Sequence, residues 1–158
     1  MTIYAIFQMI TMLALLVTAS LIDIKTKKIP NYITLPAFII AVILTIIYAR
    51  SSFLENTIAT IVCFTFGALG LMGLGDIKLI MCIIMLCGWH TALFGVLFSA
   101  FIFVAIHFLQ HPDTIIGEIK KAVLGVFKGT LHVNGESRKA FAPYISVGTL
   151  ISYVIITL

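Results

Sequence analysis

Long apolar runs dominate this chain, and their length restricts the folds open to it. Four runs approach the length of a membrane-crossing helix, at residues 3–22, 33–49, 57–72 and 141–158. A helix needs about 20 residues to cross the ~30 Å hydrocarbon layer of a bilayer. Of the 158 residues, 61% are hydrophobic and only 10% are charged, whereas soluble globular chains carry about 25% charged residues. The sequence therefore predicts an all-α protein that crosses a membrane several times.

A fifth apolar stretch, residues 77–110, is too long for one comfortable span. Gly88, Trp89 and His90 interrupt it. Glycine loosens a helix, while Trp and His suit a membrane interface. We therefore divide the stretch into a short helix over 77–88 and a fuller helix over 90–110. The result is six transmembrane helices in a single membrane-embedded domain over residues 1–158.

The placement of basic residues favours six spans with the amino terminus outside. Only Arg50 then falls on the outer side, and the inner loops hold the other Lys and Arg residues: Lys25, Lys27, Lys28, Lys78, Lys120, Lys121, Lys128, Arg138 and Lys139. Cytoplasmic loops of membrane proteins carry such an excess. A single helix over 77–110 would instead move a loop with five basic residues across the membrane. We therefore expect a cell-membrane protein with a cytoplasmic loop at 111–140.

The predicted cytoplasmic loop has a helical pattern of its own. Apolar residues recur in it at spacings of three and four, among lysines: Ile115, Ile116, Ile119, Val123, Val126 and Phe127. This pattern indicates an amphipathic helix that lies in the inner interface near anionic headgroups. A solvated helical linker is the alternative.

Two aspartates stand at the inner boundary of the predicted spans. Asp23 follows the first apolar run, and Asp76 lies between the third and fourth helices. A carboxylate at the edge of a bilayer is costly, which makes each a candidate functional residue. A pair of carboxyl groups can hydrolyse a peptide bond if one is ionised and takes a proton from water, while the other is protonated and polarises the carbonyl. The alternative for either residue alone is a simple helix boundary or cap.

The helix dipole suggests how such a pair would divide its proton. Asp23 follows the carboxyl end of a predicted helix, where a negative charge is disfavoured, and Asp76 precedes the amino end of another, where it is favoured. We therefore hypothesise that Asp76 is more often ionised and that Asp23 more often holds the proton. Such pairs titrate as a unit, so this is a bias between two coupled groups.

Short motifs surround both aspartates. Gly73-Leu74-Gly75-Asp76, followed by Lys78, is similar to the Gly-x-Gly-Asp motif of polytopic aspartyl proteases. Asp23, followed by Lys28-Ile29-Pro30-Asn31, narrows the resemblance to type IV prepilin peptidases, the leader peptidases of pili and related secretion systems. The late Ala142-Pro143-Tyr144 resembles that family's Pro-containing start of the last helix less closely.

The resemblance implies a six-helix bundle with Asp23 and Asp76 as the catalytic pair near the cytoplasmic boundary. Its substrate would be a prepilin or pseudopilin, cleaved after a Gly at the end of its leader, with membrane lipid around both proteins. The motif positions that would support the pair are Lys28, Pro30, Asn31, Gly73, Gly75 and Lys78. Topology accounts for the basic loops, so nothing calls for a nucleic-acid partner.

The cysteines depart from the longer members of that family. Those members carry an insert with paired Cys-x-x-Cys motifs that binds zinc, and they also methylate the new amino terminus. Here Cys63, Cys82 and Cys87 fall within predicted spans, and Cys82 and Cys87 lack the spacing of a zinc site. We therefore expect no metal, no cofactor and a peptidase-only form.

Two other classes of protein remain alternatives. A proton-coupled carrier also uses membrane carboxylates, but it would more naturally place them near the bilayer midplane than beside lysines at one boundary. A non-catalytic scaffold for pilus assembly would be a degenerate relative, and the intact motifs argue against it.

Overall fold

The described part of the chain is almost entirely helical. The computed structural model describes residues 3–69, 73–110 and 141–157, and no strand occurs among them. Their elements, in order, are α1 (Ile3–Thr26), α2 (Asn31–Tyr48), the 3-10 turn η1 (Arg50–Ser52), α3 (Phe53–Ala68), α4 (Leu74–Cys87), α5 (Trp89–Gln110) and α7 (Ala142–Thr157). The predicted all-α class is confirmed. The loop at 111–140, with its expected amphipathic helix, lies outside the described residues.

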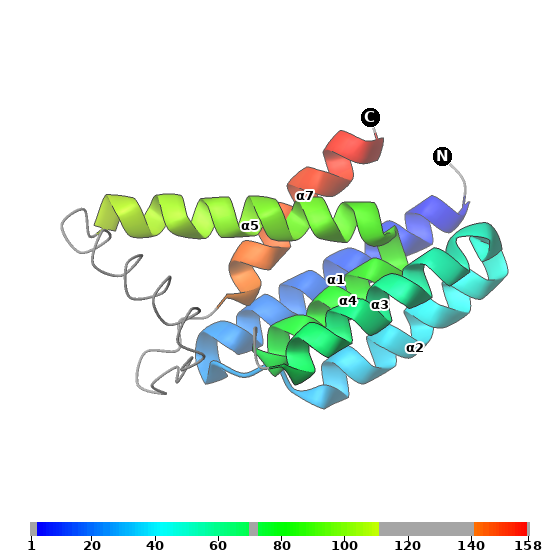
Figure 1. The fold of residues 1–158 in the computed structure, drawn as a ribbon, viewed down its shortest axis with the longest axis horizontal. Helices are drawn as coiled ribbons and strands as arrows, with labels where there is room; N and C mark the ends of the chain where they lie inside the picture. The colour runs from blue at the N-terminus through cyan, green and yellow to red at the C-terminus, as the bar shows by residue number, and fades with distance from the viewer. Residues whose placement is uncertain (1–2, 70–72, 111–140, 158) are drawn as a thin grey trace.

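Helix α4 lies at the centre of the molecule. Helices α1 to α4 run side by side with similar axes, and α5 crosses α7 beside them (Figure 1). α4 contacts α1, α2, α3, α5 and α7, and most of its side chains after Asp76 are buried. A helix surrounded by others has no need to present its full length to lipid. This explains how a helix of only 14 residues belongs in the bundle.

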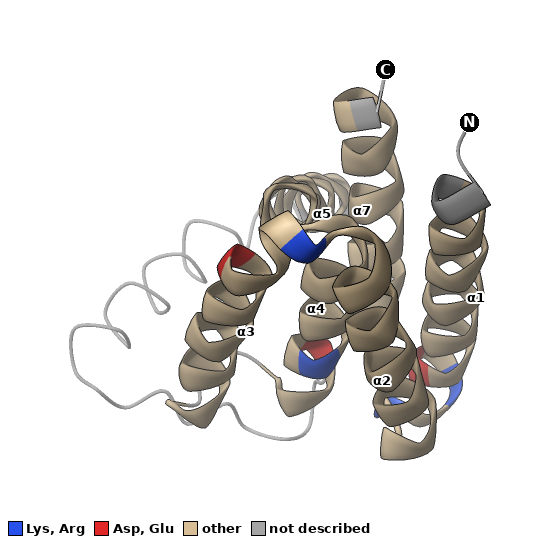
Figure 2. Ribbon diagram, turned by 90° about the vertical axis from the view of Figure 1, so that its right-hand side faces the viewer, with Lys and Arg blue, Asp and Glu red and all other residues tan. Residues whose placement is uncertain are grey.

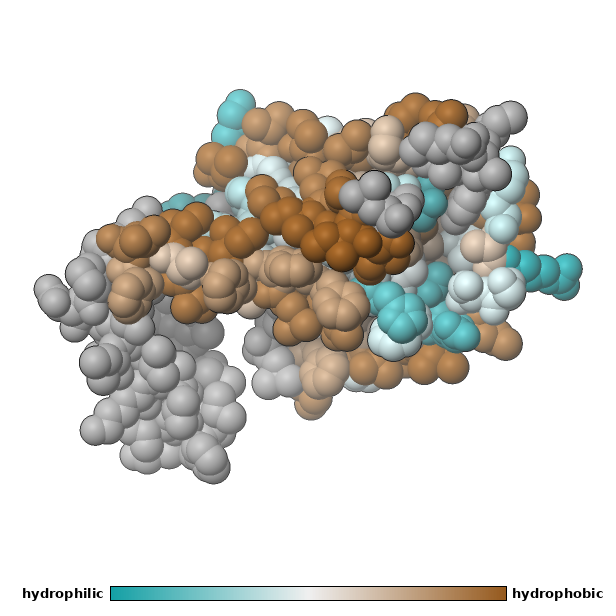
Figure 3. Space-filling view, turned by 90° about the horizontal axis from the view of Figure 1, so that it is seen from above, coloured by the Kyte–Doolittle hydropathy of each residue, from teal (hydrophilic) through white to brown (hydrophobic). Residues whose placement is uncertain are grey.

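The outside of the bundle is apolar. Large hydrophobic side chains stand exposed on several helices, among them Leu54 at 71%, Phe101 at 73% and Leu109 at 79%. Apolar residues cover most of the face seen in Figure 3, and hydrophilic ones form limited patches. Exposed apolar surface of this extent would be unfavourable in water, but it is the normal outer surface of a bundle in lipid.

Among the described residues, three helices are long and apolar enough to cross a membrane: Ile6–Thr26 within α1, Asn31–Tyr48 and Trp89–Ile106 within α5. Ala142–Ile156 within α7 is a shorter apolar helix. α3 and α4 have 16 and 14 residues, or lengths of about 24 and 21 Å at 1.5 Å per residue, below the ~30 Å of the hydrocarbon layer. The arrangement with six spans therefore stays a prediction.

The predicted division of residues 77–110 is confirmed. α4 ends at Cys87, and Gly88 follows with φ +89° and ψ 157°, a conformation that residues with a side chain rarely adopt. α5 then begins at Trp89, whose main-chain N–H donates to the Oδ1 atom of buried Asn56, at 3.2 Å. A glycine with positive φ and a polar cap from α3 together end one helix and begin the next.

Small residues allow α5 and α7 to cross at close range. A methyl group added at Gly148 would lie 2.7 Å from the main-chain N of Ser99, and closer still to the Ser99 Oγ and the Gly95 O. One turn further along, the Ser152 hydroxyl donates to the Thr91 O at 3.0 Å. Close approach of small residues, with hydrogen bonds between helices, is how helices associate in lipid.

We expect Gly148→Val to separate α5 from α7, because the added side chain would overlap main-chain atoms that cannot rotate away. The free energy of unfolding in detergent micelles should fall by about 1–3 kcal/mol. Val147→Ala, on the exposed side of the same helix, is the control and should change it by no more than about 0.5 kcal/mol. Equal stability of the two variants would contradict the close crossing.

Candidate active site

Asp23 lies in the last turn of α1 and points into the protein. Its side chain is only 5% exposed, and its Oδ2 atom accepts a hydrogen bond of 3.0 Å from the main-chain N–H of Ala142, the first residue of α7. The expectation that Asp23 follows the first helix is wrong, because α1 continues to Thr26. The apolar run ends before the helix does, since the last turn is built from polar residues.

The chain reverses sharply between α1 and α2. The N–H of Lys27 donates to the Asp23 O at 2.8 Å, and Lys27 itself has φ +53°, the left-handed conformation that commonly ends a helix. Pro30 is extended, with φ −77° and ψ 149°, and α2 starts at Asn31. Pro30 and Asn31 thus form a sharp start of α2, two residues before the predicted run at 33–49.

Asp76 lies in the first turn of α4. Gly73 is the residue before this helix, and its C=O accepts the first helical hydrogen bond from the Ile77 N–H, at 3.1 Å. A methyl group added at Gly73 would lie 2.9 Å from the Oδ2 of Asp76. The carboxylate therefore folds back over Gly73 toward the amino end of α4, where the helix dipole favours a negative charge. Asp76 is half-buried.

We hypothesised that Asp76 is more often ionised and that Asp23 more often holds the proton, but the helix dipoles do not predict this difference. Asp76 was expected to precede its helix, but α4 starts at Leu74 and Asp76 lies within its first turn. Asp23 lies at the carboxyl end of α1, but its carboxylate meets the amino end of α7. Both carboxylates therefore face the positive end of a helix. The hypothesis considered only the helix that carries Asp23 and not the helix packed against it.

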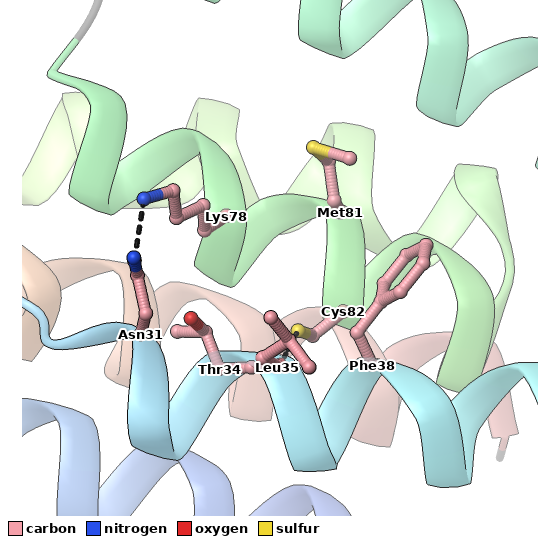
Figure 4. A pocket seen from close by; sticks show the side chains of 7 residues that line it. All are labelled: Asn31, Thr34, Leu35, Phe38, Lys78, Met81 and Cys82. Carbon is pink, nitrogen blue, oxygen red and sulfur yellow. Dashed lines mark hydrogen bonds between the residues drawn. The ribbon is translucent and has the colours of Figure 1, made fainter.

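The two motifs pack against each other. Ile29, in the turn after α1, is buried, and a methyl group added at Gly75 would lie 3.4 Å from its Cβ. Lys78 donates through Nζ to the Oδ1 of Asn31, at 2.6 Å (Figure 4). The turn therefore packs against α4 beside Gly75, and the hydrogen bond from Lys78 connects the start of α2 to α4. Lys28 is exposed at this turn.

Asp23 and Asp76 lie at the same end of the bundle. At the opposite end, Gln8 near the start of α1 donates to the Leu86 O near the end of α4, at 2.5 Å. The two helices are therefore antiparallel, and the end of α1 lies level with the start of α4. Figure 2 shows acidic and basic residues together at this end, with a second small charged group at the far end. We call the end with Asp23 and Asp76 the aspartate end.

A groove of about 200 Å³ opens between α2 and α4. It is lined by Asn31, Thr34, Leu35, Phe38, Lys78, Met81 and Cys82 (Figure 4). Lys78 is two residues from Asp76, which places them about 200° apart around the helix. The groove and Lys78 therefore lie on the side of α4 that faces away from Asp76. Lys78 donates its hydrogen bond to α2, through Asn31.

Sequence reasoning missed a pair of serines beside Asp23. The hydroxyls of Ser20 on α1 and Ser146 on α7 are 2.6 Å apart, and the Ser146 Oγ also lies 3.2 Å from the Leu16 O. Ser20 is three residues before Asp23, and Ser146 is four after Ala142, so the serines lie one turn further along the same helix faces. The signal available in the sequence was a polar residue, Ser20, one helical turn before Asp23.

The cysteines take part in helix packing. The thiol of Cys82 donates to the Thr34 O at 3.3 Å, and that of Cys87 lies 3.3 Å from the Met12 Sδ. Cys63 is a partly buried neighbour of the core. In the described part of the chain, no three His, Cys, Asp or Glu side chains come together as a metal site would require.

Comparison with protein families yields a match to this chain. The model of the type IV leader peptidase family matches residues 10–109, more than half of the chain. The matched segment contains Asp23, Asp76 and the motifs around them, and it ends before α7. A search of curated proteins and a search of solved structures each found no match.

A double-mutant cycle tests the bond between the two motifs. We expect Asn31→Ala and Lys78→Met to be coupled by about 0.5–1 kcal/mol in the free energy of unfolding, because either change removes the same charged hydrogen bond at a partly exposed position. Lys25→Met combined with Asn31→Ala is the control pair and should show no coupling. Strictly additive effects of the first pair would contradict the contact.

Proposed function

Because the chain belongs to the type IV leader peptidase family, we propose that it is a membrane aspartyl endopeptidase. It cleaves the leader of prepilin-like or preflagellin-like proteins after a Gly, at the cytoplasmic boundary of the membrane, as a peptidase-only form. The observation that carries this proposal is the joining of the two aspartate motifs at one end of the bundle. Ile29 against Gly75 and Lys78 bonded to Asn31 hold both motifs there.

The proposed reaction uses Asp23 and Asp76 as one acid–base pair. The ionised carboxylate takes a proton from a water molecule, and the resulting hydroxide attacks the carbonyl carbon of the scissile peptide. The protonated partner donates to the carbonyl oxygen, and the amide nitrogen leaves after it has gained a proton. Like charges resist double ionisation, so two neighbouring carboxyls share the single proton that this reaction needs. Half-buried Asp76 is the more accessible of the two to water and substrate.

The proposed orientation places the aspartate end in the cytoplasm. Among the described Lys and Arg residues, Lys25, Lys27, Lys28 and Lys78 lie at this end, and Arg50 lies at the other (Figure 2). The positive-inside rule supports this orientation, and with it a six-span arrangement in the cell membrane. The hydrophobic helix of a prepilin would then stay in the lipid while its leader reaches the aspartates from the cytoplasm.

The position of the aspartates favours a peptidase over a proton-coupled carrier. A carrier is expected to hold its carboxylates near the bilayer midplane, yet Asp23 is in the last turn of α1 and Asp76 in the first turn of α4. A non-catalytic scaffold for pilus assembly would have the same fold. The peptidase and the scaffold differ in one testable respect: only the peptidase would cleave a prepilin in a way that depends on the two carboxyl groups.

We expect Asp23→Asn and Asp76→Asn each to lower prepilin cleavage about a hundredfold or more, because an amide neither takes nor gives the proton. The measurement is the mobility shift of a prepilin-like substrate that carries a Gly at the end of its leader, co-expressed with each variant. Glu55→Gln, at the far end of the bundle, is the matched control and should cleave normally. Normal cleavage by either aspartate variant would remove that residue from the reaction.

Gly73→Ala tests the position of the Asp76 carboxylate. The added methyl group would lie 2.9 Å from the Asp76 Oδ2, closer than van der Waals contact allows, so the carboxylate must move. We expect kcat to fall about tenfold or more, since small displacements of a reacting group are costly, while the thermal stability stays nearly unchanged. Leu74→Ala, at an exposed neighbour, serves as the control. A fully active Gly73→Ala enzyme would contradict this position of the carboxylate.

A further inference from the structure

The amino end of α7 has one main-chain donor to offer. The C=O of Phe141 accepts hydrogen bonds from the N–H of Tyr144, at 3.0 Å, and of Ile145, at 3.2 Å. Pro143 has no N–H. Of the first three residues of α7, only Ala142 therefore retains a donor that the helix does not use, and this N–H binds the Asp23 Oδ2 at 3.0 Å.

Burial makes this hydrogen bond costly to break, because each of its two groups depends on the other for a partner. Ala142 is fully buried and Asp23 is 5% exposed. A buried donor or acceptor that loses its partner cannot regain water, so separation would leave both groups unsatisfied. α7 has no charged side chain. What it presents to the carboxylate is therefore an N–H and the positive end of the helix dipole.

Contacts on two sides hold this first turn of α7 in place. Toward α1, the hydroxyls of Ser20 and Ser146 are 2.6 Å apart. Toward α5, the ring of Phe103 packs edge-on against the rings of Phe141 and Tyr144, with centroid distances of 5.5 and 5.2 Å. The turn is fixed between two helices, so the N–H of Ala142 has a defined direction.

We infer that the first turn of α7 belongs to the active site, with Ala142 as a positioning residue that orients Asp23 through its main-chain N–H. This inference rests on the proposed function. It extends the site beyond the segment matched by the family, which ends at residue 109. The residue that holds Asp23 is 119 positions away from it in the chain.

The hydrogen bond gives the two carboxylate oxygens of Asp23 different roles. It engages Oδ2, and in the proposed reaction Oδ1 is the oxygen that meets the reacting water. A carboxylate fixed at one oxygen rotates less, so its second oxygen stays in one direction. Fixed orientation of a reacting group is worth large factors in rate.

Ala142→Pro tests the inference by removing this one N–H. Proline is well tolerated as the first residue of a helix. We expect kcat to fall about tenfold or more, with KM unchanged within about twofold, because orientation of the catalytic group is lost and substrate binding is not. Ala142→Gly keeps the N–H and should retain kcat within about threefold. Asp23→Asn is the reference without catalysis.

The split between kcat and KM separates orientation of Asp23 from a merely structural role, because general loss of the fold would not leave KM unchanged. If Ala142→Pro does not fold, replacing Ala142 by L-lactic acid removes the same N–H without a ring, with the same expected result.

Each outcome decides between the inference and the proposed function. Full kcat in the variant without the N–H, with Asp23→Asn inactive, would overturn the inference alone. An equal loss in Ala142→Gly would also overturn it, because the methyl group and not the N–H would then matter. Cleavage by Asp23→Asn would overturn the proposed function as well.

Discussion

The burial of α4 among its neighbours is the constraint on which the rest of the structure depends. α4 contacts all five other described α-helices, and its apolar side chains from Ile77 to Leu86 form much of the core. Its amino end carries Asp76 and receives the turn that follows α1. Ile29 packs on α4 beside Gly75 and Lys78 bonds to Asn31, and these contacts bring the two motifs together.

Helix ends supply the electrostatics of the candidate site. Asp76 folds back toward the start of α4, and Asp23 is bound by the start of α7. Both carboxylates therefore lie at the amino end of a helix. In an apolar bundle, main-chain amides are the available donors, and they impose no second charge that would itself need a partner.

Local sequence patterns predicted the helices well where one residue type dictates the backbone. Gly88 ends α4 and Pro30 precedes α2, as expected, because φ is restricted by the residue itself. The end of α1 was placed too early, since the apolar run stops at Ile22 while the helix continues to Thr26. Hydropathy reports the environment of a segment and not its hydrogen bonds, so a polar last turn is invisible to it.

The candidate aspartates were found from their motifs, but their surroundings were not. The expected difference between Asp23 and Asp76 assumed that a side chain feels the dipole of its own helix, and α7 changes this. Neither Ala142 nor Ser146 carries a pattern that points to Asp23, because their contact spans more than a hundred residues of chain.

The amino-acid sequence by itself determined the all-α class, the apolar exterior and the two motifs, because each depends on composition or on neighbouring residues. Tertiary structure alone decided that α4 is central, that Ile29 packs beside Gly75 and that the amide of Ala142 faces Asp23. Those features depend on which helix faces pack together, and packing is a property of pairs of segments that no single segment encodes.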